Sequence, residues 1–516
     1  MHRTLKISQE LSYPLFDIAA TRQIEAQAQA DLLGHSLMQR AGLATARLAL
    51  ALAPHAQHVW VACGPGNNGG DGFETALQLR RLGKNVSLTW TELGKATDGS
   101  PHQQPSDARA SRLRALAAGL MISPEPPATF DFAIDALLGI GGTLSADRPG
   151  TLLMTQWLNH MHGSGAPVLC IDLPTGLNAD TGASLFKTSR LGARHTLSLL
   201  TLKPGLFTAD GRDAAGQVWL DDLSVDPPSD IKPCAMLQGV NSEMNLTQQQ
   251  RAHASHKGSF GDVAVLGGAH GMVGAALLAA RAALHAGAGR VFVALLTEAA
   301  DSVLWVDTSQ PELMFRNPSA LDLKQQVLVC GCGGGQAMQA HLPALLADAT
   351  RAVLDADALN AIAADTTLQA LLTTRQSHGY ATVLTPHPLE AARLLQSSTH
   401  DVQSDRRRAA QQLADRFDCV VVLKGSGSVI ATPGRIALIN HSGNALLASP
   451  GTGDVLAGMI GAMLAAGLPA RTAAARAVFI HGQLADRWAD PCAKTSATSG
   501  TPEALTASAL ARCASA

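Results

Sequence analysis

Short apolar segments alternate with helical patterns along most of the chain, and this alternation constrains the fold more than any other feature. In the first half the apolar segments lie at residues 58–63, 86–90, 132–138 and 168–173. In the second half they lie at 262–266, 291–295, 327–330, 352–355, 381–384 and 420–423. Continuous apolar strands of this length, joined by helices, are typical of parallel sheets covered on both faces. The pattern predicts an α/β protein with doubly wound sheets.

The composition supports two domains and argues against several classes of protein. The 516 residues are 46% hydrophobic and 4% aromatic, with a formal net charge of −2. This composition favours neither nucleic-acid binding nor attraction to anionic membranes. We expect the short basic cluster Arg406–Arg408 to be a solvated helix face. Because no apolar run of ~18 residues and no signal-like N-terminus is present, we expect a soluble, cytoplasmic protein.

The domain boundary is predicted from a break in the alternation. Segment 221–232 (DDLSVDPPSDIK) is rich in proline and charge, as linkers often are. We therefore expect domains at 1–228 and 236–510, joined by a linker at 229–235. The eight cysteines include no CxxC pair, so we expect buried thiols in a reducing compartment and neither disulfides nor a zinc site.

The segment Gly451–Asp454 places a carboxylate in a glycine-framed turn that opens an apolar, helical run. Unpaired backbone N–H groups at a helix start can bind an anion. The Asp454 carboxylate beside them could act as a base, and phosphoryl transfer to a hydroxyl needs both elements. Taken alone, the turn could also be a capped helix start.

Two further segments follow predicted strands of the second half. Lys424–Ser428 could hold nucleotide phosphates through its N–H groups and lysine, or could be a plain hairpin turn. His387 lies between two prolines and could be a binding residue or a turn residue. Because ligands bind at the carboxyl ends of parallel strands, we expect these segments to face one site.

A second glycine-rich turn, GPGNNGGDG at residues 64–72, follows the first predicted strand and precedes a helix predicted from Phe73. Its glycines are expected to allow close backbone approach and positive φ. The turn matches neither the Rossmann nor the Walker pattern. A phosphate-binding turn and a tight turn capped by Asp71 therefore both fit it.

Two aspartates, Asp135 and Asp172, lie at the ends of predicted strands in the first half. Asn68, Asp135 and Thr175 supply hard oxygen ligands suited to a monovalent cation or to Mg²⁺. Asp172 could serve as an acid or a base, or it could cap the turn that follows.

The segments YPLFDIAATRQIEAQAQADLLGHSLMQRAG, GPGNNGGDG, DALLGIG and DLPTGL resemble the NAD(P)H-hydrate epimerase domain over residues 12–226. The resemblance implies a Rossmann-like three-layer fold that interconverts the R and S forms of NADHX and NADPHX. It implies acid–base catalysis by Asp172 and potassium binding by Asn68, Asp135 and Thr175. The residues implied to contact the hydrated dinucleotide are Asn67, Asn68, Gly69, Gly70, Asp71, Gly139, Ile140, Gly141, Gly142, Thr143, Leu144, Ser145 and Asp172.

The segments HKGSFGDV, DADALN, TPHPLEAARLL, LKGSGS and GNALLASPGTGDVLAGMI resemble the ADP-dependent NAD(P)H-hydrate dehydratase domain, which has a ribokinase-like fold, over residues 252–487. The resemblance implies dehydration of the S hydrate with ADP and Mg²⁺, giving AMP and phosphate, with Asp454 as the base. The implied hydrate-binding residues are Ala275, Gly333, His387 and Asp454. The implied nucleotide-binding residues are Lys424, Gly425, Ser426, Gly427, Ser428 and Gly453. Cys332 departs from the usual GPGLG pattern.

Together the two resemblances predict a bifunctional repair enzyme whose partners are small molecules. We expect a homo-oligomer, with a tetramer as one option. One alternative is a ribokinase-like kinase of a small alcohol, although such a kinase would have no use for GPGNNGGDG and DLPTGL. Another is an N-terminal ligand-binding module without catalysis, which the presence of Asn68, Asp135 and Asp172 disfavours.

Overall fold

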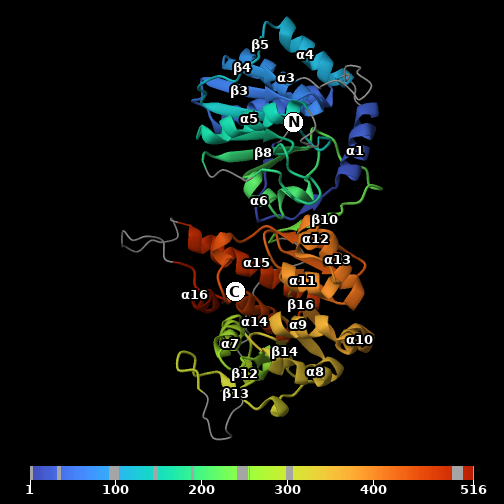
Figure 1. Ribbon diagram of the computed structural model, residues 1–516, viewed down its shortest axis with the longest axis vertical. Coiled ribbons are helices and arrows are strands. Elements are labelled where there is room, and N and C mark those ends of the chain that lie inside the picture. Colours follow the sequence, from blue (N-terminus) through green and yellow to red (C-terminus); the bar gives the residue numbers. More distant parts are fainter. Residues whose placement is uncertain are drawn as a thin grey trace. The chain divides into compact units, whose positions relative to one another are not determined.

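The computed structural model describes residues 4–31, 36–91, 104–142, 149–186, 191–240, 254, 256–297, 306–490 and 504–514. The chain forms two compact units (Figure 1). Unit 1 comprises Met1–Ser8 and Pro14–Ala235, and unit 2 comprises Gln9–Tyr13 and Met236–Ala516. Unit 2 thus includes a short N-terminal segment that a single boundary at 229–235 assigns to the first domain.

Unit 1 is built on an 8-stranded sheet, as far as its strands are described, in the order β1-β9-β8-β7-β6-β3-β4-β5. The strands are β1 (Leu5–Lys6), β3 (His58–Cys63), β4 (Asn85–Trp90), β5 (Ile122–Ser123), β6 (Phe132–Ala136), β7 (Val168–Ile171), β8 (Arg194–Leu199) and β9 (Gln217–Asp221). The helices are α1 (Ile18–Asp31), α2 (Leu37–Leu52), α3 (Asn67–Arg81), α4 (Ser106–Ala117), α5 (Pro149–Gly163) and α6 (Gly211–Ala214). Every neighbouring pair is parallel except β1 with β9.

Helices cover both faces of this sheet, as the continuous apolar strands predict. Alternate residues of a strand point to opposite faces. In β3, Val59 and Val61 join the core formed with α2 and α3. Trp60 and Ala62 join a separate core with Trp157 of α5. Unit 1 is therefore a three-layer α/β domain.

The second sheet has 11 strands among the described residues, in the order β13-β12-β11-β14-β15-β16-β17-β18-β19-β10-β2, and nearly all of its residues belong to unit 2. The strands are β2 (Tyr13–Leu15), β10 (Ala235–Gln238), β11 (Asp262–Gly267), β12 (Arg290–Leu295), β13 (Met314–Phe315), β14 (Val327–Cys330), β15 (Arg351–Leu354), β16 (Ala381–Leu384), β17 (Val420–Leu423), β18 (Val429–Thr432) and β19 (Arg435–Asn440). The helices are α7 (Val273–His285), α8 (Leu342–Asp348), α9 (Ala356–Ala364), α10 (Thr366–Thr374), α11 (Pro388–Leu395), α12 (Thr399–Ser404), α13 (Arg406–Phe417), α14 (Thr452–Ala465), α15 (Ala470–Ala489) and α16 (Ala507–Arg512). Pairing is parallel from β13 to β17 and antiparallel from β17 to β19. The expected α/β fold class is thus confirmed.

Helix α14 is apolar on all sides because it lies within the core of unit 2, together with α7, α15 and α16 (Figure 1). It packs so closely on α7 that a Cβ at Gly458 would lie 2.0 Å from the carbonyl oxygen of Ala279. Such packing makes α14 a rigid support for the residues at its N-terminus.

Each sheet contains a point where the strand order reverses. In unit 1 the order reverses between β3 and β6, and in unit 2 between β11 and β14. The loops that leave the carboxyl ends of two such strands diverge and leave a crevice, where ligands bind in open α/β sheets. Both glycine-rich loops discussed below lie at these positions.

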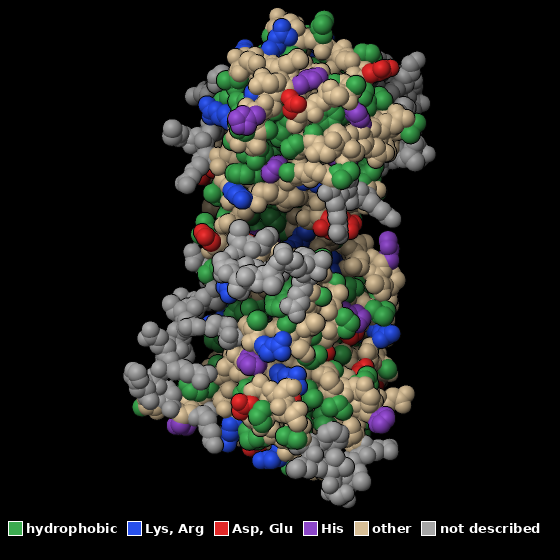
Figure 2. Space-filling view, turned by 90° about the vertical axis from the view of Figure 1, so that its left-hand side faces the viewer, with side chains coloured by type: hydrophobic (Ala, Val, Ile, Leu, Met, Phe, Trp, Pro, Cys, Tyr) green, Lys and Arg blue, Asp and Glu red, His purple; other side chains and the backbone are tan. Residues whose placement is uncertain are grey.

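On the face drawn in Figure 2, acidic and basic side chains are scattered among polar and apolar ones. None of the helices that the structure describes combines the length and the apolar character needed to cross a membrane.

Candidate active sites

The first glycine-rich turn lies at the strand-order reversal of unit 1 and leads directly into α3. This helix begins at Asn67 and not near Phe73 as predicted. None of the glycines in the turn has positive φ, so that expectation is wrong. At least one position requires glycine because the backbone segments approach closely there. A Cβ at Gly69 would lie 1.9 Å from the carbonyl oxygen of Gly64. The helix can begin within the glycine-rich segment because glycine has no side chain that would collide with the neighbouring backbone.

A cavity of about 660 Å³ opens at this reversal point, and its volume is typical of small-molecule sites. The predicted residues that line it are Asn67, Asn68, Asp71, Gly139, Ile140, Gly141, Gly142 and Asp172. Gly69 and Gly70 do not line it, since they pack against the protein behind the turn. Thr143, Leu144 and Ser145 lie outside the described residues.

Asp172 follows β7 and is held by a buried lysine that sequence reasoning missed. The Lys203 Nζ donates to Asp172 Oδ1 at 2.5 Å, and the lysine side chain is only 1% exposed. Asp172 has a φ of 65°, a strained value for a residue other than glycine. Its second carboxylate oxygen lies near the backbone of Gly139 and Ile140 in the cavity wall. The only available sequence signal was a single lysine in the otherwise uncharged segment TLKPGL.

Two of the other carboxyl groups that line this cavity, those of Glu25 and Asp71, have raised pKa values. Burial, followed by the charge of Asp172, raises the pKa of Glu25. Burial, followed by the charges of Asp172 and Glu25, raises the pKa of Asp71 well above its usual value. Carboxyl groups that keep their protons can donate hydrogen bonds, so Glu25 and Asp71 could act as donors in this cavity.

The three predicted potassium ligands surround the loop that follows β6. Asp135 is buried and accepts hydrogen bonds from Thr175 N at 3.0 Å and from Thr175 Oγ1 at 2.7 Å. Thr175 Oγ1 in turn accepts from Leu138 N at 3.0 Å. The Asn68 side chain is buried, and neither of its amide atoms has a hydrogen-bond partner among the described residues. A buried amide oxygen without a partner and a buried carboxylate are both ligands of the kind that a hard cation prefers.

The reversal point of unit 2 is closed by the glycine-rich loop after β14. Gly268 N donates to Cys332 O at 2.9 Å, and Ala269 N donates to Gly333 O at 2.6 Å. A Cβ at Gly333 would lie 3.0 Å from the Cβ of Ala275 on α7. The structure therefore brings together Ala275 and Gly333, two of the predicted hydrate-binding residues.

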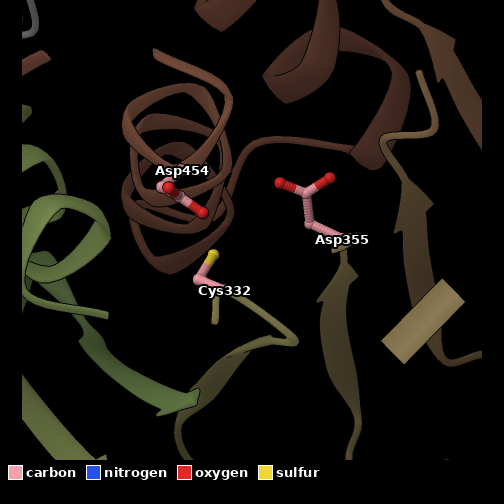
Figure 3. A group of neighbouring side chains, drawn as sticks. All are labelled: Cys332, Asp355 and Asp454. Carbon is pink, nitrogen blue, oxygen red and sulfur yellow. The ribbon is translucent and has the colours of Figure 1, made fainter. Parts of the chain in front are cut away.

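Asp454 lies in the first turn of α14, whose N-cap is Gly451 with a φ of 88°. Together with Cys332 and Asp355 it forms a compact group whose ligand atoms lie within 4.8 Å of one another (Figure 3). Burial and the neighbouring Asp355 carboxylate raise the pKa of Asp454 to about 6. A carboxylate tuned in this way is ionised at neutral pH and can still accept a proton.

The Lys424–Ser428 segment connects the antiparallel strands β17 and β18 and is thus a hairpin turn. Its lysine points to the carboxylates: Lys424 Nζ donates to Asp355 Oδ1 at 2.6 Å and would lie 3.3 Å from a Cβ at Gly453. Burial lowers the pKa of Lys424, but the charges of Asp355 and Glu390 outweigh burial and raise it, so the ammonium stays charged. Asp355 is not among the predicted site residues, although it ends the segment predicted at 352–355.

Arg406 is buried against the backbone of this hairpin. This corrects the expectation of a solvated helix face at 406–408. The residue is 1% exposed, whereas Arg408, two positions along α13, is exposed. The guanidinium donates to Leu423 O at 3.3 Å and to Lys424 O at 3.1 Å. Burial lowers the pKa of Arg406 to about 10, which leaves it charged at neutral pH. A buried guanidinium therefore fixes the backbone of the predicted nucleotide loop.

His387 is the N-cap of α11. Its Nδ1 accepts from Leu389 N at 3.1 Å and from Glu390 N at 3.4 Å, so the ring proton resides on Nε2. The Nε2 atom lies 3.1 Å from Glu390 Oε1. Both nitrogens are thus engaged in the capping arrangement, while 46% of the side chain remains exposed.

Two α/β units, each with carboxylates and a lysine at a strand-order reversal, define a two-site α/β enzyme. Residues 263–505 match the family model described as NAD(P)H-hydrate dehydratase, and residues 34–205 match the model described as YjeF-related protein N-terminus. The chain is 36% identical over 471 residues to the bifunctional NAD(P)H-hydrate repair enzyme Nnr of Escherichia coli (strain K12), covering 89% of this chain and 86% of that protein. The chain belongs to the family of bifunctional NAD(P)H-hydrate repair enzymes.

A second relative matches one unit alone. The ADP-dependent (S)-NAD(P)H-hydrate dehydratase of Neisseria meningitidis is 40% identical over 242 residues, which cover 46% of this chain and 80% of that protein. Among solved structures, the ADP/ATP-dependent NAD(P)H-hydrate dehydratase of Bacillus subtilis is 27% identical, with a TM-score of 0.41, covering 51% of this chain and 91% of that one.

Proposed function

We propose that the chain repairs NADH and NADPH that have been hydrated on the nicotinamide ring. Unit 1 interconverts the R and S hydrates, NADHX and NADPHX. Unit 2 dehydrates the S form with ADP and releases AMP and phosphate. The observation that carries the proposal is the likeness to the E. coli repair enzyme, which extends over 471 residues and therefore spans both units.

The site in unit 1 favours this function over a kinase acting on a small alcohol. Such a kinase would need only the second site. Unit 1 nevertheless holds a cavity of about 660 Å³ lined by Asp172 and Lys203. A buried ion pair is costly to build, and its place in a cavity wall favours a catalytic role over mere ligand storage.

In the epimerase site we assign acid–base catalysis to Asp172. The hydrated carbon bears both the ring nitrogen and the hydroxyl, so its configuration can invert through proton transfers without oxidation. The Asp172 oxygen that faces the cavity would move the proton, while Lys203 holds the other oxygen. Asn67, Asn68, Asp71 and the Gly139 loop would bind the dinucleotide around it.

We assign potassium to Asn68, Asp135 and Thr175. The buried Asn68 amide and the buried Asp135 carboxylate fit such an ion. When bound, K⁺ would supply positive charge next to the loop that carries Gly139. Asp135 and Thr175 already order the start of that loop through the Leu137 and Leu138 N–H groups.

In the dehydratase site we assign the base to Asp454. Asp454 takes the proton of the hydrate hydroxyl, and the hydroxyl oxygen attacks the terminal phosphorus of ADP while the bond to AMP breaks. The ring-nitrogen electrons then expel phosphate, and loss of the neighbouring ring proton restores the double bond. The N–H groups at the start of α14 and the charged Lys424 stabilise the moving phosphoryl group.

The other predicted residues of unit 2 complete this site. Gly425, Ser426, Gly427, Ser428 and Gly453 would hold the nucleotide, and Ala275, Gly333 and His387 would line the hydrate pocket. Mg²⁺ on the nucleotide phosphates would neutralise developing charge, and Asp355 offers it oxygen ligands of the preferred kind. A cytoplasmic location and a homo-oligomeric state stay predictions.

The test uses a mixture of R and S NADHX with ADP and Mg²⁺. We expect full conversion to NADH, faster than spontaneous epimerisation allows. Asp172→Asn should stop at the S fraction, whereas Asp454→Asn should form no NADH while the R and S forms still equilibrate. A wild-type reaction that stops at the S fraction would rule out the epimerase. NADH formation by Asp454→Asn at the wild-type rate would rule out the assigned base.

A further inference from the structure

The dehydratase site contains a thiol that phosphoryl transfer does not use. Cys332 follows β14, and its side chain is buried. Its Sγ, one oxygen of Asp355 and one oxygen of Asp454 lie within 4.8 Å of one another. We propose that these three side chains bind a thiophilic divalent cation, such as Zn²⁺ or Cd²⁺, and that the bound ion inhibits the dehydratase. The inhibition rests on the proposed function of unit 2, but the binding does not.

The geometry suits such an ion. The three side chains come from the loop after β14, from the end of β15 and from the first turn of α14, and Figure 3 shows them converging. Zinc binds sulfur at about 2.3 Å and oxygen at about 2.0–2.2 Å, which places tetrahedral ligands roughly 3.5 Å apart. Ligand atoms that lie within 4.8 Å of one another need only a small approach to reach this spacing.

The backbone positions of the three ligands are fixed without a metal. Cys332 O accepts from Gly268 N at 2.9 Å, which anchors the loop to β11. Asp355 N donates to Cys330 O at 3.0 Å, and Asp454 belongs to a helix packed into the core. The ion would therefore find its ligands already placed, which lowers the entropy cost of binding.

The charges also suit a divalent ion. Two carboxylates and one ammonium, that of Lys424, meet in this group. Lys424 uses Asp355 Oδ1, which leaves Asp355 Oδ2 for the ion. When the cation binds, the thiol proton goes to solvent and a metal–sulfur bond forms without any redox step. The three anionic ligands are then neutralised by the cation together with Lys424.

The sulfur ligand sets the selectivity. Mg²⁺ and Ca²⁺ prefer oxygen ligands, whereas Zn²⁺ and Cd²⁺ accept a thiolate readily. The proposed ion thus differs in ligand preference from the Mg²⁺ that accompanies the nucleotide, although both would use Asp355. Because it would occupy the Asp454 carboxylate, the hydroxyl proton of the hydrate would lose its acceptor.

The experiment titrates the metal-free full chain with Cd²⁺ and follows the ultraviolet charge-transfer band of the cadmium–thiolate bond. The variants are Cys332→Ser and Cys332→Ala, so that a folding defect in one does not decide the outcome. Cys513→Ser is the matched control, because Cys513 is an exposed thiol outside the site. We expect both Cys332 variants to lose one equivalent of the saturable band that the control retains.

A second measurement follows NADH formation from the S hydrate with Zn²⁺ added over excess Mg²⁺. The Zn²⁺ concentration for half-inhibition, relative to each variant's own metal-free rate, should rise at least about tenfold in the Cys332 variants. Unchanged bands and unchanged half-inhibition would overturn the proposal. A Cys332-dependent band in a protein that forms no NADH would support the metal site and remove the proposed function instead.

Discussion

Lys203 Nζ lies 2.5 Å from Asp172 Oδ1, within the cavity of unit 1. The same ammonium donates to Leu199 O at 2.8 Å and contacts Ser198 Oγ at 3.3 Å. An ammonium has three donors, and these three contacts use them all. Lys203 therefore positions Asp172 and has no spare N–H to donate to a substrate.

Replacing this lysine should stop epimerisation without affecting dehydration. In Lys203→Met, Asp172 loses the group that orients it, and we expect at least about a 100-fold slower equilibration of R and S NADHX. Dehydration of purified S hydrate should stay at the wild-type rate. Lys232→Met, at an exposed lysine of the same unit, is the control. Equal epimerisation by both variants would contradict the role of Lys203.

Lys203→Met should also destabilise unit 1, and a second substitution at Asp172 should restore part of the lost stability. Removing one partner of a buried pair costs about 3–5 kcal/mol because the other charge stays buried. Lys203→Met should therefore unfold at lower urea concentration than the wild type. The double variant Lys203→Met, Asp172→Asn should regain much of that loss, yet remain without epimerase activity. A double variant as unstable as the single one would speak against the buried pair.

Asp454→Asn should stabilise the protein at neutral pH. Burial and Asp355 raise the pKa of Asp454 to about 6 in the folded state, against about 3.9 in an unfolded chain. The folded state thus binds the Asp454 proton more tightly than the unfolded chain does. The stability that the protonated Asp454 contributes is present at about pH 4 and is lost as pH rises through about 6. We expect the variant to exceed the wild type by about 2–3 kcal/mol at pH 7. Urea unfolding at both pH values checks whether the gap closes in acid.

The acidic limb of the dehydratase pH profile should report the same group. Asp454 must be ionised to act as a base, so the rate should fall as pH drops through about 6. Asp355→Asn removes the second-largest cause of the raised pKa and leaves the Lys424 charge to act on Asp454. The limb of kcat/KM should therefore move to lower pH in this variant. A limb that stays in place or moves upward would exclude Asp454 as the titrating base.

Arg406 should matter for the nucleotide, whereas its exposed neighbour should not. Arg406→Met removes the donors that hold Leu423 O and Lys424 O. Hydrogen bonds to a charged group contribute about 1.5–3 kcal/mol each, so the KM for ADP should rise at least about tenfold. Arg408→Met, on the same helix, should leave it unchanged. Initial-rate measurements over a range of ADP concentrations distinguish the two.

Potassium dependence tests the cation site of unit 1. Thr175→Val keeps the shape of the side chain but removes the hydroxyl that lies 2.7 Å from Asp135 Oδ1. We expect the epimerase of the wild type to be faster in K⁺ than in Li⁺, and the variant to lose most of that difference. Dehydration of S hydrate serves as the internal control. Equal rates of the wild type in both salts would remove the assigned ion.

Part of the strand order could be read from the sequence because it depends on local periodicity, whereas β8, β9, β18 and β19 were not predicted. The strands predicted at 58–63, 327–330, 381–384 and 420–423 match the observed bounds. The start of α3 was missed because glycines are poor helix formers, and local propensity favours a turn there. Only the packing of the turn against its surroundings shows that the glycines belong to the helix.

The family was indicated by the resemblance of several segments to a known one, whereas the glycine-framed aspartate at 451–454 and the turns around it predicted the kind of chemistry. They could do so because backbone N–H groups and a carboxylate at a helix start are properties of a few consecutive residues. Partners far apart in sequence were beyond such reasoning. Lys203 meets Asp172 across 31 residues, and Lys424 meets Asp355 across 69.

Only the tertiary structure decided which charged groups are buried and what they face. Arg406 and Arg408 look alike in sequence, yet one lies under the hairpin and the other in solvent. The raised pKa of Asp454 likewise arises from burial and from Asp355, which β15 brings beside it. The cost of burying a charge and the gain from pairing it depend on distances that sheet topology sets, not on the order of residues along the chain.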